Sequence, residues 1–326
     1  MTITYQAFDH GTAPADGATL IANFGGGFDS TAFLIECVRR GIRPDLILFA
    51  DVGAEIPETY AHVAAFSAWL VEQGMPAVTV VSRHGTGRQY GPASLLYRDD
   101  EATGKRVRVA EGYTNIIGNM LSNETLPGEA FGRGGCSVKW KHEPMDAFLA
   151  AHPLIIADRA AGRVPVKMVG FNAGPADMKR KAPLEGEAAC KKPAHVGGFA
   201  FWYPLQAWGI DRNEVEAIVR AAGFDGCRKS SCYFCPNMTE GELESLQDEH
   251  PDLLAKAIEI EDTARKGKHG LRIEGLWRRT RKSDGRPGSW RVWAEDRGFI
   301  ERDPSVREHV AQVQAARRSK CRKLAA

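Results

Sequence analysis

The chain has 326 residues, with 43 lysines and arginines against 41 aspartates and glutamates, and 43% of its residues are hydrophobic. This balance fits one large or two medium globular domains and excludes disordered, collagen-like and mini-protein classes. The first residues lack the basic start and apolar run of a signal peptide, and no stretch approaches the roughly 20 apolar residues of a membrane helix. We therefore expect a cytoplasmic protein without a membrane partner.

Positive charge is concentrated near the C-terminus. From Gly275 to Ala326 there are 14 lysines and arginines against 6 acidic residues, a local balance of +8. Such a segment is typical of a surface that binds a polyanion such as nucleic acid, and equally of a solvated basic face.

Apolar runs alternate with helical patterns along the first half of the chain. The predicted strands cover residues 19–24, 45–50, 77–81 and 164–171. The first helix should have Asp29 or Ser30 as its N-cap and end before Gly41, and the second should span residues 57–72. Strands that alternate with helices predict an α/β fold, with an open, mostly parallel twisted sheet covered by helices on both faces.

Later helices carry clear boundary signals. Asp211 with Glu214, and Thr239 with Glu242, form capping boxes. The predicted helices cover residues 139–151, 211–222 and 253–265, followed by an amphipathic helix around Val306, Val310 and Val313. We expect a nucleotide-binding domain over residues 1–225, a Cys-containing helical region over 226–300 and a basic helical tail over 301–326.

A glycine run joins the first predicted strand to the first predicted helix. Gly25, Gly26 and Gly27 come just before Asp29 and Ser30. Such a run lets backbone N–H groups approach an anion, and the positive end of the helix dipole points at the bound charge. The pattern is neither G-x-x-x-x-G-K-[ST] nor G-x-G-x-x-G. It indicates either a phosphate site or a tight strand-to-helix turn.

The string from Phe24 to Thr31 resembles the S-G-G-x-D-S loop of the PP-loop ATP pyrophosphatases, with Gly25 in the place of the first serine. Other segments resemble the phosphoadenosine phosphosulfate (PAPS) reductase branch of that superfamily, namely Phe49 to Gly53, Pro57 to Thr59, Cys136 to Lys141, Gly170-Phe171, and Tyr203 to Leu205 with Trp208. Uncharacterised bacteriophage proteins of this branch share a Cys-x-x-Cys-Pro turn and a Gly-Leu…Ser-Trp stretch, here Gly275-Leu276 and Ser289-Trp290. The resemblance covers roughly residues 18–293 and implies an adenine nucleotide alpha hydrolase-like fold.

The resemblance also implies a site for ATP and Mg²⁺. The β- and γ-phosphates would be held by Gly25, Gly26, Gly27, Asp29, Ser30 and Thr31. Asp51 and Gly53 would lie near the nucleoside, and Gly170 with Phe171 would line the adenine side. Asp29 and Ser30 would in addition take part in catalysis.

Two positive regions are further candidates. Arg180 and Lys181 follow the fourth predicted strand, the edge where ligands bind in an open α/β sheet, and could contact the α-phosphate or be plain surface charges. Cations interleave with aromatic rings at Trp277, Arg278, Arg279, Arg281, Lys282, Arg286, Trp290, Arg291 and Trp293. That composition suits stacked bases and phosphates, or a tryptophan-anchored packing element with solvated arginines.

Seven cysteines, an odd number, argue against a disulfide framework and favour metal or redox chemistry. Cys227, Cys232 and Cys235 lie within nine residues, and Cys136 is the favoured fourth ligand because Lys139 and neighbouring cations would lower its pKa. A [4Fe–4S] cluster, a four-thiolate zinc site and metal-free thiols all fit this pattern. The resemblance supports Cys136, Cys232 and Cys235 as ligands. Cys37 should be a core residue and Cys190 an exposed loop thiol.

These features together predict an ATP pyrophosphatase. It would adenylate an acceptor, release pyrophosphate and let a sulfur nucleophile displace AMP, with an iron–sulfur cluster carrying sulfide. The partners would be a nucleic acid or small thiol acceptor and a sulfur-donor protein, and the chain could be an oligomer. A sulfonucleotide (PAPS or APS) reductase is the first alternative, which the setting of Cys321 disfavours because no Glu-Cys-Gly surrounds it. A non-catalytic module that binds ATP and nucleic acid around a structural zinc is the second.

Overall fold

The computed structural model describes residues 17–83, 85–86, 97–99, 106–108, 115–127, 135–181 and 198–325. The chain divides into two compact units. The first consists of Met1–Asp51, Glu55–Arg88 and Lys139–Ser230, and the second of Val52–Ala54, Gln89–Val138 and Ser231–Ala326. The segments predicted as 226–300 and 301–326 thus fall mostly within a single unit, together with residues from the irregular stretch 84–135. Cys190 lies outside the described residues.

The first unit is built on a parallel sheet. Its strands are β1 (Leu20–Asn23), β2 (Leu46–Ala50), β3 (Val78–Ser82), β7 (Val166–Val169) and β8 (Ala200–Trp202), with the two-residue β4 (Gly85–Thr86) added antiparallel to β3. The order across the sheet is β4-β3-β2-β1-β7-β8, and the five longer strands run parallel. In the central strand, Ala22 pairs with Ile47 on one side and Met168 on the other. The α/β class with a mainly parallel sheet is therefore confirmed.

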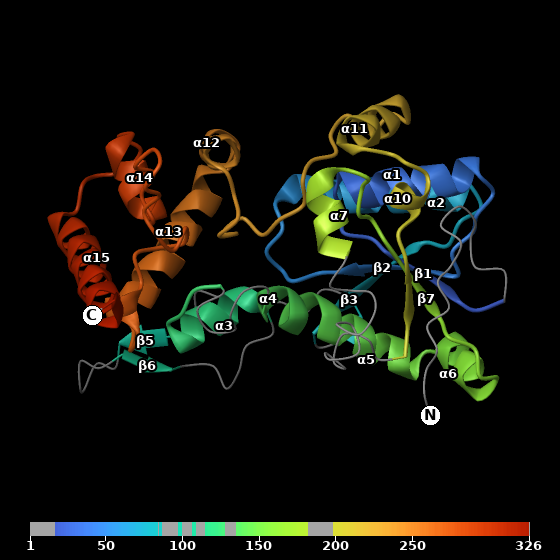
Figure 1. Cartoon of the computed structure of the whole chain (residues 1–326), viewed down its shortest axis with the longest axis horizontal. Helices are drawn as coiled ribbons and strands as arrows, with labels where there is room; N and C mark the ends of the chain where they lie inside the picture. The colour runs from blue at the N-terminus through green and yellow to red at the C-terminus, as the bar shows by residue number, and fades with distance from the viewer. Residues whose placement is uncertain are drawn as a thin grey trace. The chain divides into compact units, whose positions relative to one another are not determined.

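Helices cover both faces of this sheet (Figure 1). Leu20 and Ala22 face α1, α2, α10 and α11, whereas Ile21 between them faces α5 and α6. The bounds are Phe28–Arg39 for α1, Pro57–Glu72 for α2, Glu143–Ala151 for α5, Pro153–Ala160 for α6, Pro204–Ala207 for α10 and Arg212–Ala221 for α11. Because residues alternate between two buried faces, the strands read as continuous apolar runs.

Several helix boundaries were correctly predicted, and one cap was not. α2 covers the predicted residues 57–72 with Pro57 at its first turn, and the Asp211–Glu214 capping box is present at the start of α11. The prediction of Asp29 or Ser30 as N-cap of α1 is wrong, because Gly27 is the N-cap and no side chain caps this helix. The Ser30 hydroxyl bonds the Gly27 carbonyl instead.

Several elements differ from the predicted pattern, and three of them belong to the first unit's sheet and the helices beside it. The stretch expected as one helix from residue 139 to 151 begins with the short α4 (Gly135–Ser137) and a π-helix (Val138–His142) before α5. β8 and α6 were not predicted. They have three and eight residues, so neither carries enough of a periodic pattern to be recognised.

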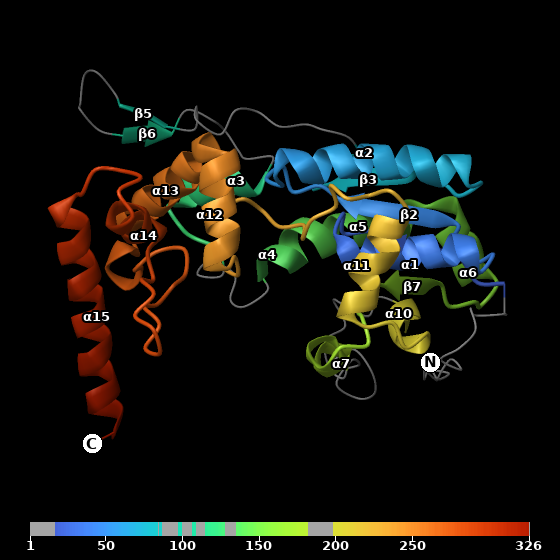
Figure 2. The same cartoon turned by 90° about the horizontal axis from the view of Figure 1, so that it is seen from above.

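The second unit is mainly helical. Its elements are β5 (Tyr97–Asp99), β6 (Arg106–Arg108), α3 (Ile116–Asn123), α12 (Glu240–Glu249), α13 (Pro251–Lys266), a 3-10 turn (Gly270–Arg272), α14 (Trp290–Asp296) and α15 (Pro304–Ala325). α13 packs against α3, α12 and α14 (Figure 2). The Thr239–Glu242 capping box is confirmed at the start of α12. Val306 and Val310 of α15 pack on Val292, which confirms the predicted amphipathic face.

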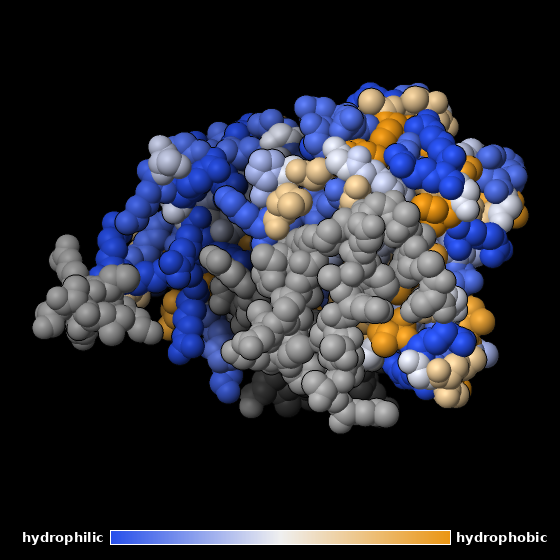
Figure 3. Space-filling view, turned by 45° about the vertical axis from the view of Figure 1, so that its right-hand side comes forward, coloured by the Kyte–Doolittle hydropathy of each residue, from blue (hydrophilic) through white to orange (hydrophobic). Residues whose placement is uncertain are grey.

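The visible described surface is largely hydrophilic, with apolar residues in separate patches (Figure 3). Among the described residues, the exposed large apolar side chains are Val71, Leu154, Ile156, Met178, Leu271 and Phe299. Within the described ranges, no helix combines the length and the apolar character that crossing a membrane requires.

Candidate functional site

The strand order changes direction at β1, in the middle of the first unit's sheet. From β1 the chain builds outward through β2 and β3, and it then continues on the other side of β1 with β7 and β8. In open α/β sheets, ligands bind where the strand order reverses in this way. The loops that leave this point are Gly25–Gly27 after β1 and Gly170 after β7.

These two loops approach each other at backbone distance. A Cβ atom added at Gly170 would lie 3.0 Å from the backbone nitrogen of Ser30 in the first turn of α1. Gly26 adopts a φ of 74°, and a Cβ atom there would lie within 3.3 Å of Thr59, Val63 and Phe49. Side chains at these positions would be strained or would push the loops apart.

The glycine loop offers backbone donors. Gly25 is exposed, and its N–H donates to the Ser30 hydroxyl at 3.1 Å. Among the described residues, the N–H groups of Gly26 and Gly27 have no hydrogen-bond partner. Because the loop also opens the 12-residue α1, these donors coincide with the positive end of a helix dipole. The loop therefore combines the two backbone features, these N–H groups and a helix N-terminus, that favour a bound anion.

Ser30 and Thr31 hold the backbone of this loop by hydrogen bonds. The Ser30 hydroxyl accepts from Gly25 and donates to the Gly27 carbonyl at 3.1 Å. Thr31 is fully buried, and its hydroxyl donates to the same carbonyl at 2.9 Å while its N–H bonds that carbonyl as well. The resemblance implied that Thr31 contacts the phosphates. In the structure, both of its donors bond the Gly27 carbonyl inside the fold, so Thr31 supports the loop instead.

A buried histidine supports Thr31. The Nε2 atom of His62 lies 2.9 Å from the Thr31 hydroxyl, and since that hydroxyl donates to Gly27, the imidazole is the donor. Phe24, Phe66 and Phe224 surround the ring. Burial lowers the pKa of His62 from 6.5 to about 4. The imidazole is therefore neutral near pH 7, and sequence inspection had not singled it out.

Asp29 is held by two residues that the sequence did not reveal as important. Its Oδ1 accepts from the Asn172 side chain at 2.9 Å, and its Oδ2 pairs with Arg212 at 3.3 Å. Asn172 follows Gly170 and Phe171 and also accepts from the Gly174 N–H at 2.8 Å. The Asn172 amide thus ties the loop after β7 to the first turn of α1. Its position directly after Gly170-Phe171 is the one sequence signal for this role.

The remaining nucleotide candidates are distributed around this edge. Asp51 ends β2, is buried, and accepts from the Tyr60 hydroxyl at 2.8 Å. Phe171 stacks on Tyr203 with ring centroids 5.7 Å apart. Gly53, with a φ of 76°, lies in the short segment that belongs to the second unit. Arg180 and Lys181 end α7 (Pro175–Lys181), and the structure describes their backbone but not their side chains.

The four candidate metal ligands are divided between the units. Cys227 belongs to the first unit, is 2% exposed, and has its sulfur 3.9 Å from the Thr31 hydroxyl. Burial raises its pKa to about 11, so it is a protonated thiol beneath the glycine loop. Cys136, Cys232 and Cys235 belong to the second unit, and among the described residues these three sulfur atoms do not gather within 4.8 Å. Cys37 is a buried core residue, as predicted.

The basic and aromatic stretch of the second unit is a packing element. Trp277, Trp290 and Trp293 are at most 5% exposed, and the Trp277 indole donates to the Met238 carbonyl at 2.7 Å. The Arg286 guanidinium lies 4.3 Å above the Trp277 ring. These buried indoles are not presented for base stacking, so of the two interpretations the structure favours tryptophan-anchored packing.

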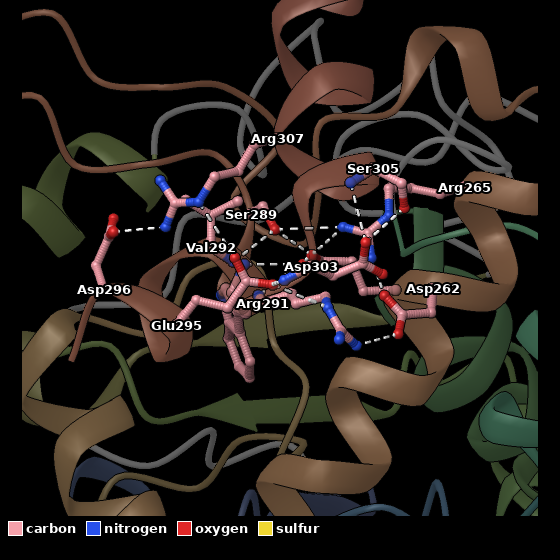
Figure 4. Close-up of polar contacts among 12 residues, drawn as sticks. Asp262, Arg265, Ser289, Arg291, Val292, Glu295, Asp296, Asp303, Ser305 and Arg307 are labelled. Atoms are coloured by element: carbon pink, nitrogen blue, oxygen red, sulfur yellow. Dashed lines mark hydrogen bonds and ion pairs between the residues drawn. The ribbon is translucent and has the colours of Figure 1, made fainter. Parts of the chain in front are cut away.

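Several cations of this unit are paired within it (Figure 4). Arg291 contacts Asp262 at 2.7 Å, and Arg307 contacts Asp296 at 2.6 Å. Each such pair reduces the positive potential that a nucleic acid would meet. Asp296 is already counted in the local balance of +8, but Asp262 lies outside residues 275–326, so its pairing with Arg291 makes that balance overstate the charge that is free to bind a polyanion.

No protein-family model matches the chain, and a search of curated proteins finds no similar one. Function is therefore inferred from the glycine loop, the strand order and the side chains around them, together with the motif resemblance.

Proposed function

We propose that the first unit binds ATP on the Gly25–Gly27 loop and is an ATP pyrophosphatase that adenylates an acceptor. One observation carries this proposal. The loop, with N–H groups of Gly26 and Gly27 unpaired among the described residues, lies at the point where the strand order reverses, with Gly170 packed against it. Phosphate recognition by such a loop is a general property of α/β sheets. The resemblance to the PP-loop motif and to an adenine nucleotide alpha hydrolase-like fold supports the same site.

The chemistry follows from where the loop would hold the nucleotide. With the β- and γ-phosphates against the amides, an acceptor oxygen attacks the α-phosphorus. The bond from that phosphorus to the bridging oxygen then breaks, and pyrophosphate leaves with the electron pair. Negative charge grows on the bridging oxygen, which the loop donors and the helix dipole stabilise. The product is an AMP ester of the acceptor, from which a sulfur or nitrogen nucleophile can displace AMP.

Asp29 is the residue of this loop that fits Mg²⁺. Its carboxylate is partly exposed and accepts hydrogen bonds from Asn172 and Arg212, and carboxylate oxygens are ligands that Mg²⁺ prefers. A magnesium ion bound with ATP supplies neutralisation of the phosphate charge. Asn172 and Arg212 orient the carboxylate for this role.

Sulfur transfer is the version of this function that the resemblance favours, with a nucleic acid or a small thiol as acceptor and a sulfur-donor protein as partner. Cys136, Cys232 and Cys235 remain the ligands that the resemblance implies for an iron–sulfur cluster, which would carry the sulfide. The sulfonucleotide reductase alternative would need Cys321, which lies near the end of α15. The binding-module alternative predicts ATP binding without pyrophosphate release.

Equilibrium binding of Mg·ATP, with pyrophosphate release measured in the presence of tRNA, DNA or thiol acceptors, tests the proposal. Gly170→Ala should weaken ATP binding at least about 10-fold, because the new Cβ atom would displace the first turn of α1. Gly226→Ala is the matched control, since a Cβ atom there meets nothing within 4 Å. Wild-type protein that fails to bind ATP would overturn the proposal, and binding without release would favour the binding module.

A further inference from the structure

The segment Arg228–Ser230, just before the Cys-x-x-Cys turn, lies against the glycine loop. A Cβ atom added at Gly27 would stand 3.1 Å from the Ser230 nitrogen, 3.3 Å from the Ser230 hydroxyl and 3.4 Å from the Arg228 carbonyl oxygen. A Cβ atom added at Gly25 would stand 3.8 Å from the same hydroxyl. Ser230 therefore lines the loop although it lies far along the chain, at the end of the first unit.

This segment is anchored to the helix that the loop begins. Cys227 directly precedes it, is buried, and has its sulfur 3.9 Å from the hydroxyl of Thr31 in α1. The Cys227 N–H bonds the Phe224 carbonyl at 3.0 Å, which fixes the chain after α11. The position of Ser230 relative to the glycines is thus set by packed neighbours on its N-terminal side.

The hydroxyl groups around the loop differ in whether they donate a hydrogen bond to another part of the protein. Ser30 and Thr31 both donate to the Gly27 carbonyl. The half-buried Ser230 forms no side-chain hydrogen bond with any residue that the structure describes. Ser230 is therefore the hydroxyl near Gly25 and Gly27 whose donor proton is uncommitted.

We propose that Ser230 is a phosphate-binding residue whose hydroxyl donates to a β- or γ-phosphate oxygen of the nucleotide held by Gly25–Gly27. The proposal rests on the proposed function, since it assigns a further donor to the same site. Arg228 and Lys229 are exposed on the same segment and add positive potential at this side of the loop. The segment therefore favours polyphosphates, ATP and pyrophosphate, over AMP.

Calorimetric titrations of Mg·ATP, pyrophosphate and AMP into wild type, Ser230→Ala and Ser245→Ala test this inference. Ser230→Ala removes one hydroxyl, and the loss of a hydrogen bond to a charged phosphate should weaken ATP and pyrophosphate binding about 10-fold. AMP affinity and the melting temperature should stay unchanged. Ser245→Ala is the control, because Ser245 is exposed on α12 and bonds only its own helix, at the Gly241 carbonyl.

The outcomes separate the two proposals. Selective loss of ATP and pyrophosphate affinity in Ser230→Ala supports the role of Ser230. Unchanged affinities, or an equal loss for AMP, would overturn that role while leaving the ATP site intact. Wild-type protein that binds neither ATP nor pyrophosphate would overturn the nucleotide site, and the role of Ser230 with it.

Discussion

The Gly25–Gly27 loop of the first unit and the Gly275-Leu276 turn of the second differ in whether a side chain accepts hydrogen bonds from the backbone N–H groups. In the second unit, the buried carboxylate of Glu261 accepts from the N–H groups of Leu276 and Trp290 at 2.8 and 2.9 Å. In the first unit, the N–H groups of Gly26 and Gly27 find no such acceptor among the described residues. Close backbone approach is therefore common to both turns, but a buried carboxylate accepts from backbone N–H groups of the second turn, whereas no described side chain does so for Gly26 and Gly27.

Glu261 also explains the Gly-Leu…Ser-Trp stretch. A Cβ atom added at Gly275 would clash with the Ser289 backbone and with a Glu261 oxygen, so the position requires glycine. The carboxylate also bonds the Ser289 hydroxyl and pairs with Arg265, whose guanidinium contacts Asp262. In this protein the motif stabilises the second unit and needs no ligand.

The largest expected effect comes from removing this carboxylate. Glu261→Ala should lower the unfolding free energy of the second unit by about 3–5 kcal/mol, because several buried donors and a buried guanidinium lose their partner. Chemical denaturation monitored by tryptophan fluorescence measures the change. Glu259→Ala, an exposed position on the same helix, is the control. ATP affinity should survive, and a loss equal to that of Gly170→Ala would contradict the contrast between the two turns.

The second effect is a pH dependence of the first unit. The folded pKa of His62, about 4, lies below its unfolded value near 6.5, so the unfolded state binds more protons between these pH values. As the pH is lowered from 6.5 to about 4, the unfolding free energy should fall by about 1.4 kcal/mol per pH unit, and by up to about 3 kcal/mol in total. His62→Gln should remove this acid sensitivity, whereas His269→Gln, at an exposed position, should not. An NMR titration that found a pKa of His62 near 6.5 would contradict the prediction.

A third prediction concerns the unpaired amides directly. Pyrophosphate at 100 times its dissociation constant should stabilise wild type by about 2.7 kcal/mol, because it binds the folded state alone. With a 10-fold weaker site, the gain should fall to about 1.4 kcal/mol in Gly170→Ala, and it should be retained in Glu259→Ala. Differential scanning calorimetry checks this, and equal stabilisation of all three proteins would point to a site elsewhere.

The smallest effect concerns Cys227. Cys227→Ser should cost about 1–2 kcal/mol of unfolding free energy, because a buried thiol next to Thr31 becomes a more polar hydroxyl. Iron, zinc and acid-labile sulfide content after anaerobic purification should equal that of wild type, since this thiol lies beneath the glycine loop. If Cys227→Ser lost metal to the same extent as Cys232→Ser, Cys227 would be a metal ligand and this prediction would be wrong.

Local signals predicted much of the fold. The apolar runs became β1, β2, β3 and β7, and α2 covers its predicted residues because Pro57 favours the first turn of a helix. Both capping boxes formed because their partners are three residues apart. β8 escaped prediction because its three residues take their strand conformation from pairing with β7.

The candidate site was predicted only in part. The glycine run and its position between a strand and a helix were visible in the sequence, whereas the partners that define its chemistry were not. Asn172 and Asp29 are 143 residues apart, and Thr31 and Cys227 are 196 residues apart. Periodicity and capping depend on neighbours within one or two turns, so the sequence by itself determined the longer periodic elements and the place of the glycine loop between a strand and a helix. Contacts over such separations depend on the order in which the strands pair, so the tertiary structure alone decided which hydroxyls face Gly27, which amides stay unpaired and where Cys227 lies.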